Sequence, residues 1–197
     1  MSQLIESIRL KDGQFSNLGY HEQRMNHSLL ELYGVVIKTE LSNLLNSLDY
    51  PKKGLYKLRI QYDHQSKTFE IIPYTYKQVT TLKLIVDNDI LYNHKYSNRA
   101  SINELFERRG NCDDILIIKK GWVTDSSYAN IIFKSGDKWY TPQTCLLKGT
   151  MRESLIRSGE IREEQIKSND MMKFKKFKLI NSMLGFEGSE HTISTIY

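Results

Sequence analysis

Four tight-turn signals constrain the fold of this chain more than any other feature of its sequence. Each signal stands between two runs with the residue character of β-strands, and such a turn predicts a hairpin of antiparallel strands. The signals are Asp12-Gly13, residues 63–66, Lys119-Lys120-Gly121 and Ser135-Gly136-Asp137. With only three prolines and eleven glycines in 197 residues, the chain is too poor in both to be fibrous or rich in linkers. We therefore expect a folded protein built on antiparallel sheets.

Helical stretches alternate with the strand-like runs. The expected strands lie at residues 4–10, 14–18, 55–62, 68–75, 82–86, 115–118, 122–124, 130–133, 138–140 and 179–180. Apolar residues recur at helical spacing at 25–33, 41–48, 102–106 and from 149 onward. Thr150 and Glu153 have the spacing of a capping box, in which the two side chains satisfy amides of a helix's first turn. This order predicts an α+β fold with a small α+β lobe at 1–86 and a larger lobe at 87–197.

Charge and cysteine content narrow the choice of partners. The 28 Lys and Arg against 23 Asp and Glu give a net charge of +5, which favours small anionic ligands. Nucleic-acid binding would need these cations on one face, and their densest run, residues 173–178, is expected to be a solvated edge. Cys112 and Cys145 form no paired motif, so we expect half-buried thiols in a reducing compartment. Five scattered histidines predict no metal site.

No stretch has the roughly 20 apolar residues that cross a bilayer, and the first residues carry no signal-peptide pattern. We therefore expect a cytoplasmic protein without a membrane partner. Common catalytic signatures are absent from the sequence as well.

The residues that remain as candidates are cations and turn residues. Lys95 stands at the break between the lobes, Asp125 leaves an apolar hairpin, and Arg24 lies on the first helix. Thr150 and Met151 open a helix whose amides could bind an anion. A lysine, a carboxylate and an anion pocket suit an aldehyde phosphate cofactor, although each ingredient is common.

Taken in order, seven segments resemble the fold-type IV family of pyridoxal-phosphate enzymes, which includes branched-chain and D-amino-acid aminotransferases and aminodeoxychorismate lyase. The segments are Ile5-Glu6-Ser7-Ile8-Arg9 with Asp12-Gly13, His21-Glu22-Gln23-Arg24-Met25, Lys95-Tyr96-Ser97-Asn98-Arg99, Gly121-Trp122-Val123-Thr124-Asp125 with Ala129-Asn130, Thr141-Pro142, Gly149-Thr150-Met151-Arg152 and Ile180-Asn181-Ser182-Met183. The Lys-Tyr-Ser-Asn-Arg and Gly-Thr-Met-Arg segments look more like the lyase. The resemblance implies the two-lobed, D-amino-acid aminotransferase-like fold, with a truncated N-terminus because the family's first strands are absent before Leu4.

The resemblance also implies roles for the cofactor residues. Lys95 would hold pyridoxal phosphate covalently and move the substrate proton, and Asp125 would pair with the pyridine nitrogen. Asp125 is one methylene shorter than the family's usual Glu. Arg24 would bind the cofactor phosphate. Thr150 and Met151 would add backbone amides, and Ser182 a hydroxyl. Asn130 would orient Asp125 or substrate, or only support its turn.

Substrate recognition is left more open by the sequence. Arg59, Arg9 and Tyr92 could face the cleft. An arginine suits a substrate carboxylate, although a strand arginine that faces solvent fits Arg59 as well. Ser7 could assist protonation, or be a plain strand serine. The resemblance implies a homodimer. Three functions stay open: the lyase of folate synthesis, a class IV aminotransferase acting on a small amino acid, and a degenerate relative that only binds a carboxylate ligand or a partner.

Overall fold

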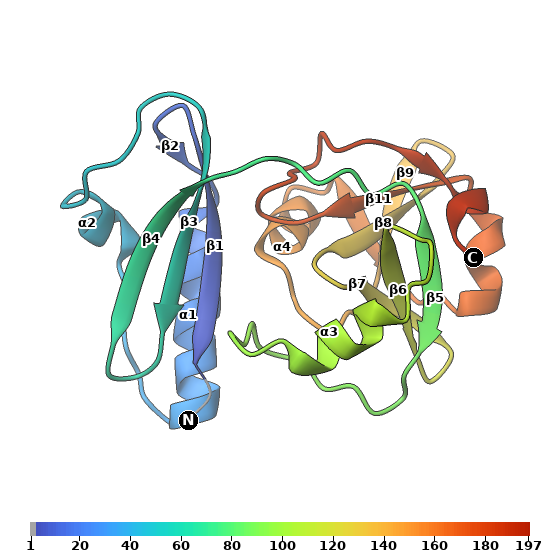
Figure 1. The fold of residues 1–197 in the computed structure, drawn as a ribbon, viewed down its shortest axis with the longest axis horizontal. Coiled ribbons are helices and arrows are strands. Elements are labelled where there is room, and N and C mark those ends of the chain that lie inside the picture. The colour runs from blue at the N-terminus through green and yellow to red at the C-terminus, as the bar shows by residue number, and fades with distance from the viewer. Residues whose placement is uncertain (1–2) are drawn as a thin grey trace. The chain divides into compact units, whose positions relative to one another are not determined.

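A computed structural model describes residues 3–197, which form two compact units (Figure 1). The first unit contains the described residues up to Tyr76 together with His94–Asn98, and the second contains Lys77–Asn93 and Arg99–Tyr197. The sequence placed a single boundary at residue 86. Instead, the strand at 82–86 belongs to the second unit, and a five-residue segment with Lys95 returns to the first.

The first unit has a four-stranded sheet of order β2-β1-β3-β4, in which every paired neighbour is antiparallel. The strands are β1 (Leu4–Lys11), β2 (Gln14–Phe15), β3 (Leu55–Tyr62) and β4 (Lys67–Pro73). Asp12 and Gly13 join β1 to β2 with φ angles of 49° and 79°. Positive φ at both positions is what a two-residue hairpin turn of type I′ requires, and Asp-Gly tolerates it. The expected second strand is shorter than predicted, because the first helix begins at Leu18.

Helix α1 (Leu18–Tyr33) covers one face of this sheet (Figure 1). It ends at Gly34, whose φ of 67° is the left-handed conformation that commonly ends a helix. Met25 and Leu29 of α1 pack against Leu4 and Ile8 of β1 in a core that also includes Leu41 and Leu45 of the short helix α2 (Leu41–Leu45). Even-numbered residues of β1 therefore face α1, and odd-numbered residues face away from it.

The segment His94–Asn98 pairs with the start of β1. The Ile5 amide donates to the Lys95 carbonyl at 2.9 Å, and the Ser97 amide donates to the Gln3 carbonyl at 2.8 Å. A bridge joins Leu4 and Tyr96 between these bonds. The position of Lys95 is thus set by backbone hydrogen bonds to a residue about ninety positions earlier in the chain.

The second unit has a larger mixed sheet of order β10-β9-β8-β7-β6-β5, with β11 paired to β8 and to β12. Its strands are β5 (Leu82–Val86), β6 (Asp114–Lys119), β7 (Trp122–Ser126), β8 (Asn130–Ser135), β9 (Lys138–Pro142), β10 (Ile161–Glu164), β11 (Lys176–Ile180) and β12 (His191–Thr192). The β5–β6 and β9–β10 pairs are parallel, and the others are antiparallel. Its other elements are helix α3 (Ala100–Glu107), helix α4 (Thr150–Arg157) and 3₁₀ turns at Ser168–Lys173 and Ile193–Thr195.

Strand β6 is buried on both faces, because successive residues join two different apolar clusters of the second unit. The lysine run at 173–178 is exposed at Lys173, Lys175 and Lys176, as expected of a solvated edge, and departs from that expectation at Lys178. Lys178 on β11 is buried, and its Nζ lies over the rings of Trp139 and Phe186 and donates to the Phe186 carbonyl at 3.3 Å. A lysine stem packs well on aromatic surface when its ammonium keeps a partner. Across residues 3–197, every helix is too short or too polar to cross a bilayer.

Candidate active site

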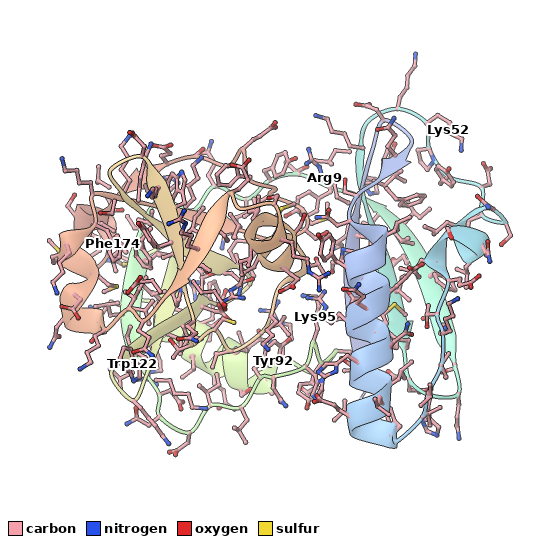
Figure 2. The ribbon with its side chains drawn as sticks, turned by 180° about the vertical axis from the view of Figure 1, so that it is seen from behind. Arg9, Lys52, Tyr92, Lys95, Trp122 and Phe174 are labelled. Atoms are coloured by element: carbon pink, nitrogen blue, oxygen red, sulfur yellow. The ribbon has the colours of Figure 1, made fainter. Side chains whose placement is uncertain are left out.

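Lys95 is the central candidate, and the residue before it fixes its segment to α1. His94 is buried; its Nδ1 lies 3.2 Å from the Ser28 hydroxyl, and its Nε2 lies 3.3 Å from Glu31. The Lys95 carbonyl accepts a hydrogen bond from the Ile5 amide of β1 at the same time. Figure 2 labels the Lys95 side chain. Lys95 is therefore presented from a segment attached to both a strand and a helix.

Arg24 of α1, the predicted phosphate residue, pairs with Glu6 of β1. Its Nε donates to Glu6 Oε1 at 2.9 Å and its Nη2 donates to Glu6 Oε2 at 2.5 Å. His21, one turn earlier on α1, places Nδ1 2.6 Å from the same Oε2. We call Glu6, His21 and Arg24 the buried triad.

The charges of the buried triad explain its protonation. Burial would raise the pKa of Glu6, but the charge of Arg24 and the contacts with His21 together hold it at about 2. Burial lowers the pKa of His21 from its usual 6.5, with the bond to Glu6 opposing the shift. The positive charges of Arg24 and Lys95 lower it further. Lys95 is held near the triad because its carbonyl binds the amide of Ile5, the residue before Glu6.

The proposed substrate residues of the first unit share the sheet face opposite α1. Ser7 lies directly across from Arg59, and Arg9 lies across from Lys57. Glu70 of β4 is the other neighbour of Arg59. The structure therefore brings Ser7, Arg9 and Arg59 onto one face, with two further charged residues among them.

Asp125, at the end of β7, is buried in the second unit and accepts three hydrogen bonds. Asn130 Nδ2 donates to Oδ1 at 2.7 Å, and the amides of Leu146 and Leu147 donate to Oδ2 at 2.9 and 3.0 Å. Burial raises its pKa to about 6, while these donors and the charge of Arg152 act in the opposite direction. Asp125 is therefore mostly ionised at neutral pH, in a rigid setting.

Asn130 contacts both Asp125 and the loop before α4. Its Nδ2 also donates to the Leu147 carbonyl at 2.9 Å, so the side chain ties the carboxylate to the loop before α4. Gly149 lies against the same side chain. A Cβ at position 149 would overlap Asn130 Oδ1 and lie 3.3 Å from its Cγ, so only glycine leaves Asn130 in place.

The N-terminus of α4 differs from the expected capping box. Gly149 is the N-cap residue, and a glycine has no side chain with which to cap the helix. Glu153 accepts a bond of 2.9 Å from Arg157 Nε four residues later, so it does not reach back to the first amides. Glu153 forms the i, i+4 ion pair instead of the capping box because Thr150 lies inside the helix, one position too late to be its N-cap residue. The amides of Thr150 and Met151 thus open the helix, while Glu153 pairs with Arg157.

Ser182 lies at the same end of the sheet as Asn130. Ile180, the last residue of β11, pairs with Asn130, and Ser182 follows two residues later and is buried. Asp125, Asn130, Ser182 and the loop before α4 therefore form one neighbourhood of the second unit.

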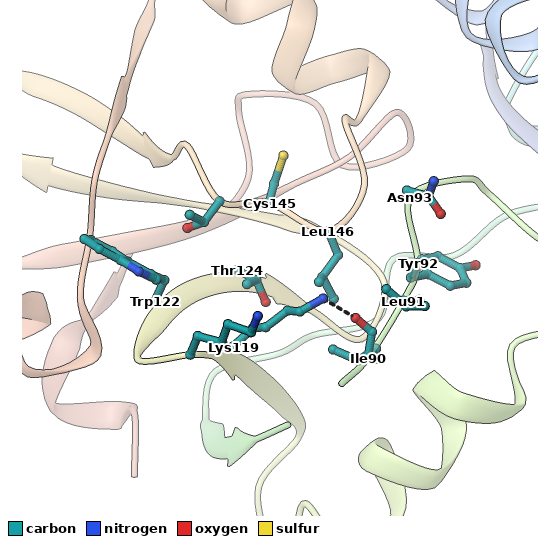
Figure 3. A pocket seen from close by; sticks show the side chains of 11 residues that line it. Ile90, Leu91, Tyr92, Asn93, Lys119, Trp122, Thr124, Cys145 and Leu146 are labelled. Atoms are coloured by element: carbon teal, nitrogen blue, oxygen red, sulfur yellow. Dashed lines mark hydrogen bonds between the residues drawn. The ribbon is translucent and has the colours of Figure 1, made fainter. Parts of the chain in front are cut away.

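Tyr92 lines a hollow of about 300 Å³ in the second unit (Figure 3). Leu146, whose amide binds Asp125, lines the same hollow, as does Cys145. Lys119 also lines the hollow, and its Nζ donates a hydrogen bond to the Ile90 carbonyl at 2.5 Å. Burial raises the pKa of the Cys145 thiol to about 12, so this cysteine is a poor nucleophile.

The fold and these residues define a class of enzyme. The family model of amino-transferase class IV matches residues 3–187, and the chain belongs to this family of pyridoxal-phosphate-dependent enzymes. A Haemophilus influenzae protein of uncharacterised function is 39% identical over 188 residues, which is 94% of this chain and all of that protein.

Two further relatives carry names. A Haemophilus somnus protein, solved as "a putative 4-amino-4-deoxychorismate lyase", is 34% identical with a TM-score of 0.89, covering 94% of this chain and 98% of that one. A Schizosaccharomyces pombe protein named "Putative aminodeoxychorismate lyase" is 28% identical over 180 residues, covering 83% of this chain and 77% of that protein. The fold-type IV resemblance seen in the sequence is confirmed.

Sequence reasoning missed the partners of the motif residues. Glu6 and His21 were seen only as parts of matching segments, and the amides that bind Asp125 were not predicted. A signal for Glu6 was present: it is the one charged residue among the apolar, helix-facing positions of β1. A carboxylate there needs a buried partner.

Proposed function

We propose that this enzyme is a pyridoxal-phosphate-dependent 4-amino-4-deoxychorismate lyase, which releases pyruvate and forms 4-aminobenzoate for folate synthesis. The observation that carries the proposal is the placement of Lys95, on a segment fixed to β1 and α1 beside the buried triad. The extent of the similarity to the Haemophilus somnus protein supports the lyase over other activities of the family.

The residues present fit the cofactor. Pyridoxal phosphate needs an amine, anion donors for its phosphate, and an acid near its pyridine nitrogen. Lys95 supplies the amine, and Asp125 the acid. Arg24, the first amides of α4 and the Ser182 hydroxyl are donors of the kind that phosphate requires. When bound, the cofactor supplies an electron sink for the charge that develops on the substrate.

Each of these residues then has a task that its surroundings support. Asp125, ionised above about pH 6, would accept a hydrogen bond from a protonated ring nitrogen. Arg24 would hold the phosphate through two of its N–H groups. Lys95 would take the proton from the substrate ring, and the ring would become aromatic as pyruvate leaves.

For substrate binding we propose the polar face of the first unit's sheet and Tyr92. Arg9 and Arg59 would bind carboxylate groups, and Ser7, across from Arg59, would assist protonation. The proposed partner is therefore a small carboxylate, not a nucleic acid or a membrane. We also propose that the enzyme is cytoplasmic and forms a homodimer. Sedimentation of the purified enzyme tests the homodimer.

The alternative is a class IV aminotransferase of the branched-chain or D-amino-acid type, which the family's own name supports. It would share the cofactor residues and would differ by a second half-reaction with a keto acid.

Absorbance spectra with added pyridoxal phosphate test the proposal. We expect a visible band in the wild type and borohydride-stable cofactor mass on Lys95. Lys95→Ala should lack both, whereas Lys83→Ala, an exposed lysine of β5, should retain them. No band at saturating cofactor would overturn the assignment of Lys95.

The product assay separates the two activities. Formation of 4-aminobenzoate from aminodeoxychorismate without any keto acid would support the lyase. Conversion only of amino acids, and only with a keto acid present, would establish the aminotransferase instead.

A further inference from the structure

We propose that Glu6 is a positioning residue that fixes the Arg24 guanidinium in the orientation needed to bind the cofactor phosphate. The inference rests on the proposed function, which assigns the phosphate to Arg24. Glu6 itself does not touch the cofactor in this proposal. It acts only through the arginine.

The first argument is the cost of burying Glu6. Its side chain is 0% exposed and lies on the helix-facing side of β1, between Leu4 and Ile8. An apolar residue would pack at this position without the large desolvation penalty of a carboxylate. The hydrogen bonds that Glu6 forms with Arg24 and His21 are therefore the reason for a charged residue at this buried position.

The second argument is the geometry of the Arg24 pair. Glu6 accepts from Nε and from Nη2, so two parallel hydrogen bonds fix the plane of the guanidinium. This pairing occupies one edge of the group and directs Nη1 away from Glu6. The Arg24 side chain is 13% exposed while Glu6 and His21 are 0% exposed, so the arginine is the part of the buried triad that reaches a ligand.

The third argument is the role of His21. A carboxylate only accepts hydrogen bonds, so His21 must donate to Oε2 from Nδ1. Its lowered pKa keeps the ring neutral, and the triad then carries one negative and one positive charge. With no net charge, the triad would recognise phosphate through directed hydrogen bonds. Orientation of Arg24 is then the property on which affinity depends.

Binding of pyridoxal phosphate and of pyridoxal, which lacks the phosphate, tests this role. Dissociation constants for both are measured with wild type, Arg24→Ala, Glu6→Gln and the double variant. We expect Glu6→Gln to raise the dissociation constant of pyridoxal phosphate by about tenfold, equivalent to about 1.4 kcal/mol, and to leave that of pyridoxal unchanged. The double variant should bind no more weakly than Arg24→Ala, because Glu6 acts through Arg24.

Ile60→Val is the matched control. Ile60 lies directly across from Glu6 on β3 and faces the same core, and the change removes one methyl group without altering a polar contact. It should leave both affinities unchanged. If Glu6→Gln does not fold, Glu6→Asp, which keeps the charge but withdraws it from Arg24, replaces it in the same comparison.

The outcomes separate the two proposals. Equal affinities of wild type and Glu6→Gln for pyridoxal phosphate, with Arg24→Ala weakened, overturn the role of Glu6 alone. An equal loss of affinity for pyridoxal phosphate and for pyridoxal also overturns the role of Glu6, because that pattern indicates general damage to the fold. A wild type that binds no pyridoxal phosphate, or an Arg24→Ala variant that binds it normally, overturns the proposed phosphate site itself.

Discussion

Replacing Gly149 by alanine should destabilise the protein through one specific side chain, Asn130. The new Cβ would overlap Asn130 Oδ1, so the amide group must leave its position. Leaving breaks its bond to the Asp125 carboxylate at 2.7 Å and its bond to the Leu147 carbonyl at 2.9 Å. The backbone itself accepts alanine, because Gly149 has a φ of −70°.

The expected size follows from those two bonds. A hydrogen bond to a charged group contributes about 1.5–3 kcal/mol and a neutral one about 1 kcal/mol. Together they give a loss of roughly 2–4 kcal/mol in the free energy of unfolding, or a fall in Tm of roughly 4–16 °C for a chain of this length. The pKa of Asp125 should rise further, because one of its donors is withdrawn.

Urea denaturation of four proteins tests the reasoning: wild type, Gly149→Ala, Asn130→Ala and the double variant. In the Asn130→Ala background the alanine at 149 has nothing to displace, so its effect should vanish or become slightly stabilising. A loss at position 149 that is equally large with Asn130 absent would refute the explanation.

Two further predictions concern titration. Asp125 has a pKa of about 6 in the folded protein against an ordinary 3.8, so the unfolded chain loses this proton first and stability falls as pH rises between those values. Urea unfolding should therefore show that Asp125→Asn reduces the loss of stability between pH 4 and pH 7 by about 2 kcal/mol; an unchanged difference would contradict the burial of this charge. At pH 8 the Cys145 thiol, with a pKa of about 12 against 9.0, should react with Ellman's reagent about 1000-fold more slowly than in the unfolded chain. A Cys112→Ser variant isolates this thiol, and rapid reaction in the native protein would refute the prediction.

Local signals predicted the elements of the fold well. The run at 55–62 coincides with β3 and the run at 82–86 with β5, because alternation and turn residues are properties of a few neighbouring positions. The unit to which β5 belongs was mispredicted. Strand pairing depends on partners distant in the chain, and the parallel partner of β5 is β6, which starts at Asp114.

The candidate site shows the same division. Motif positions such as Arg24 and Asp125 could be found from the order of segments along the chain. Their contacts could not be predicted, because they depend on packing between distant segments. Glu6 binds Arg24 because α1 packs on β1, and the Leu146 amide binds Asp125 from a loop about twenty residues later in the chain. The failed capping box is a local example: spacing allowed Glu153 to reach back, but the helix begins one residue earlier than the motif requires.

The path of the chain through the two units has a consequence for how the protein folds. The backbone passes from one unit to the other after residue 76, after residue 93 and again after residue 98. A fragment that ends at residue 76 would therefore lack the segment that pairs with the start of β1, and a fragment that begins at residue 99 would lack β5. Synthesis from the N-terminus cannot complete the first unit until Asn98 has emerged. Lys95 thus becomes ordered only when this late segment closes the first unit, after residues 77–93 of the second unit have already been synthesised.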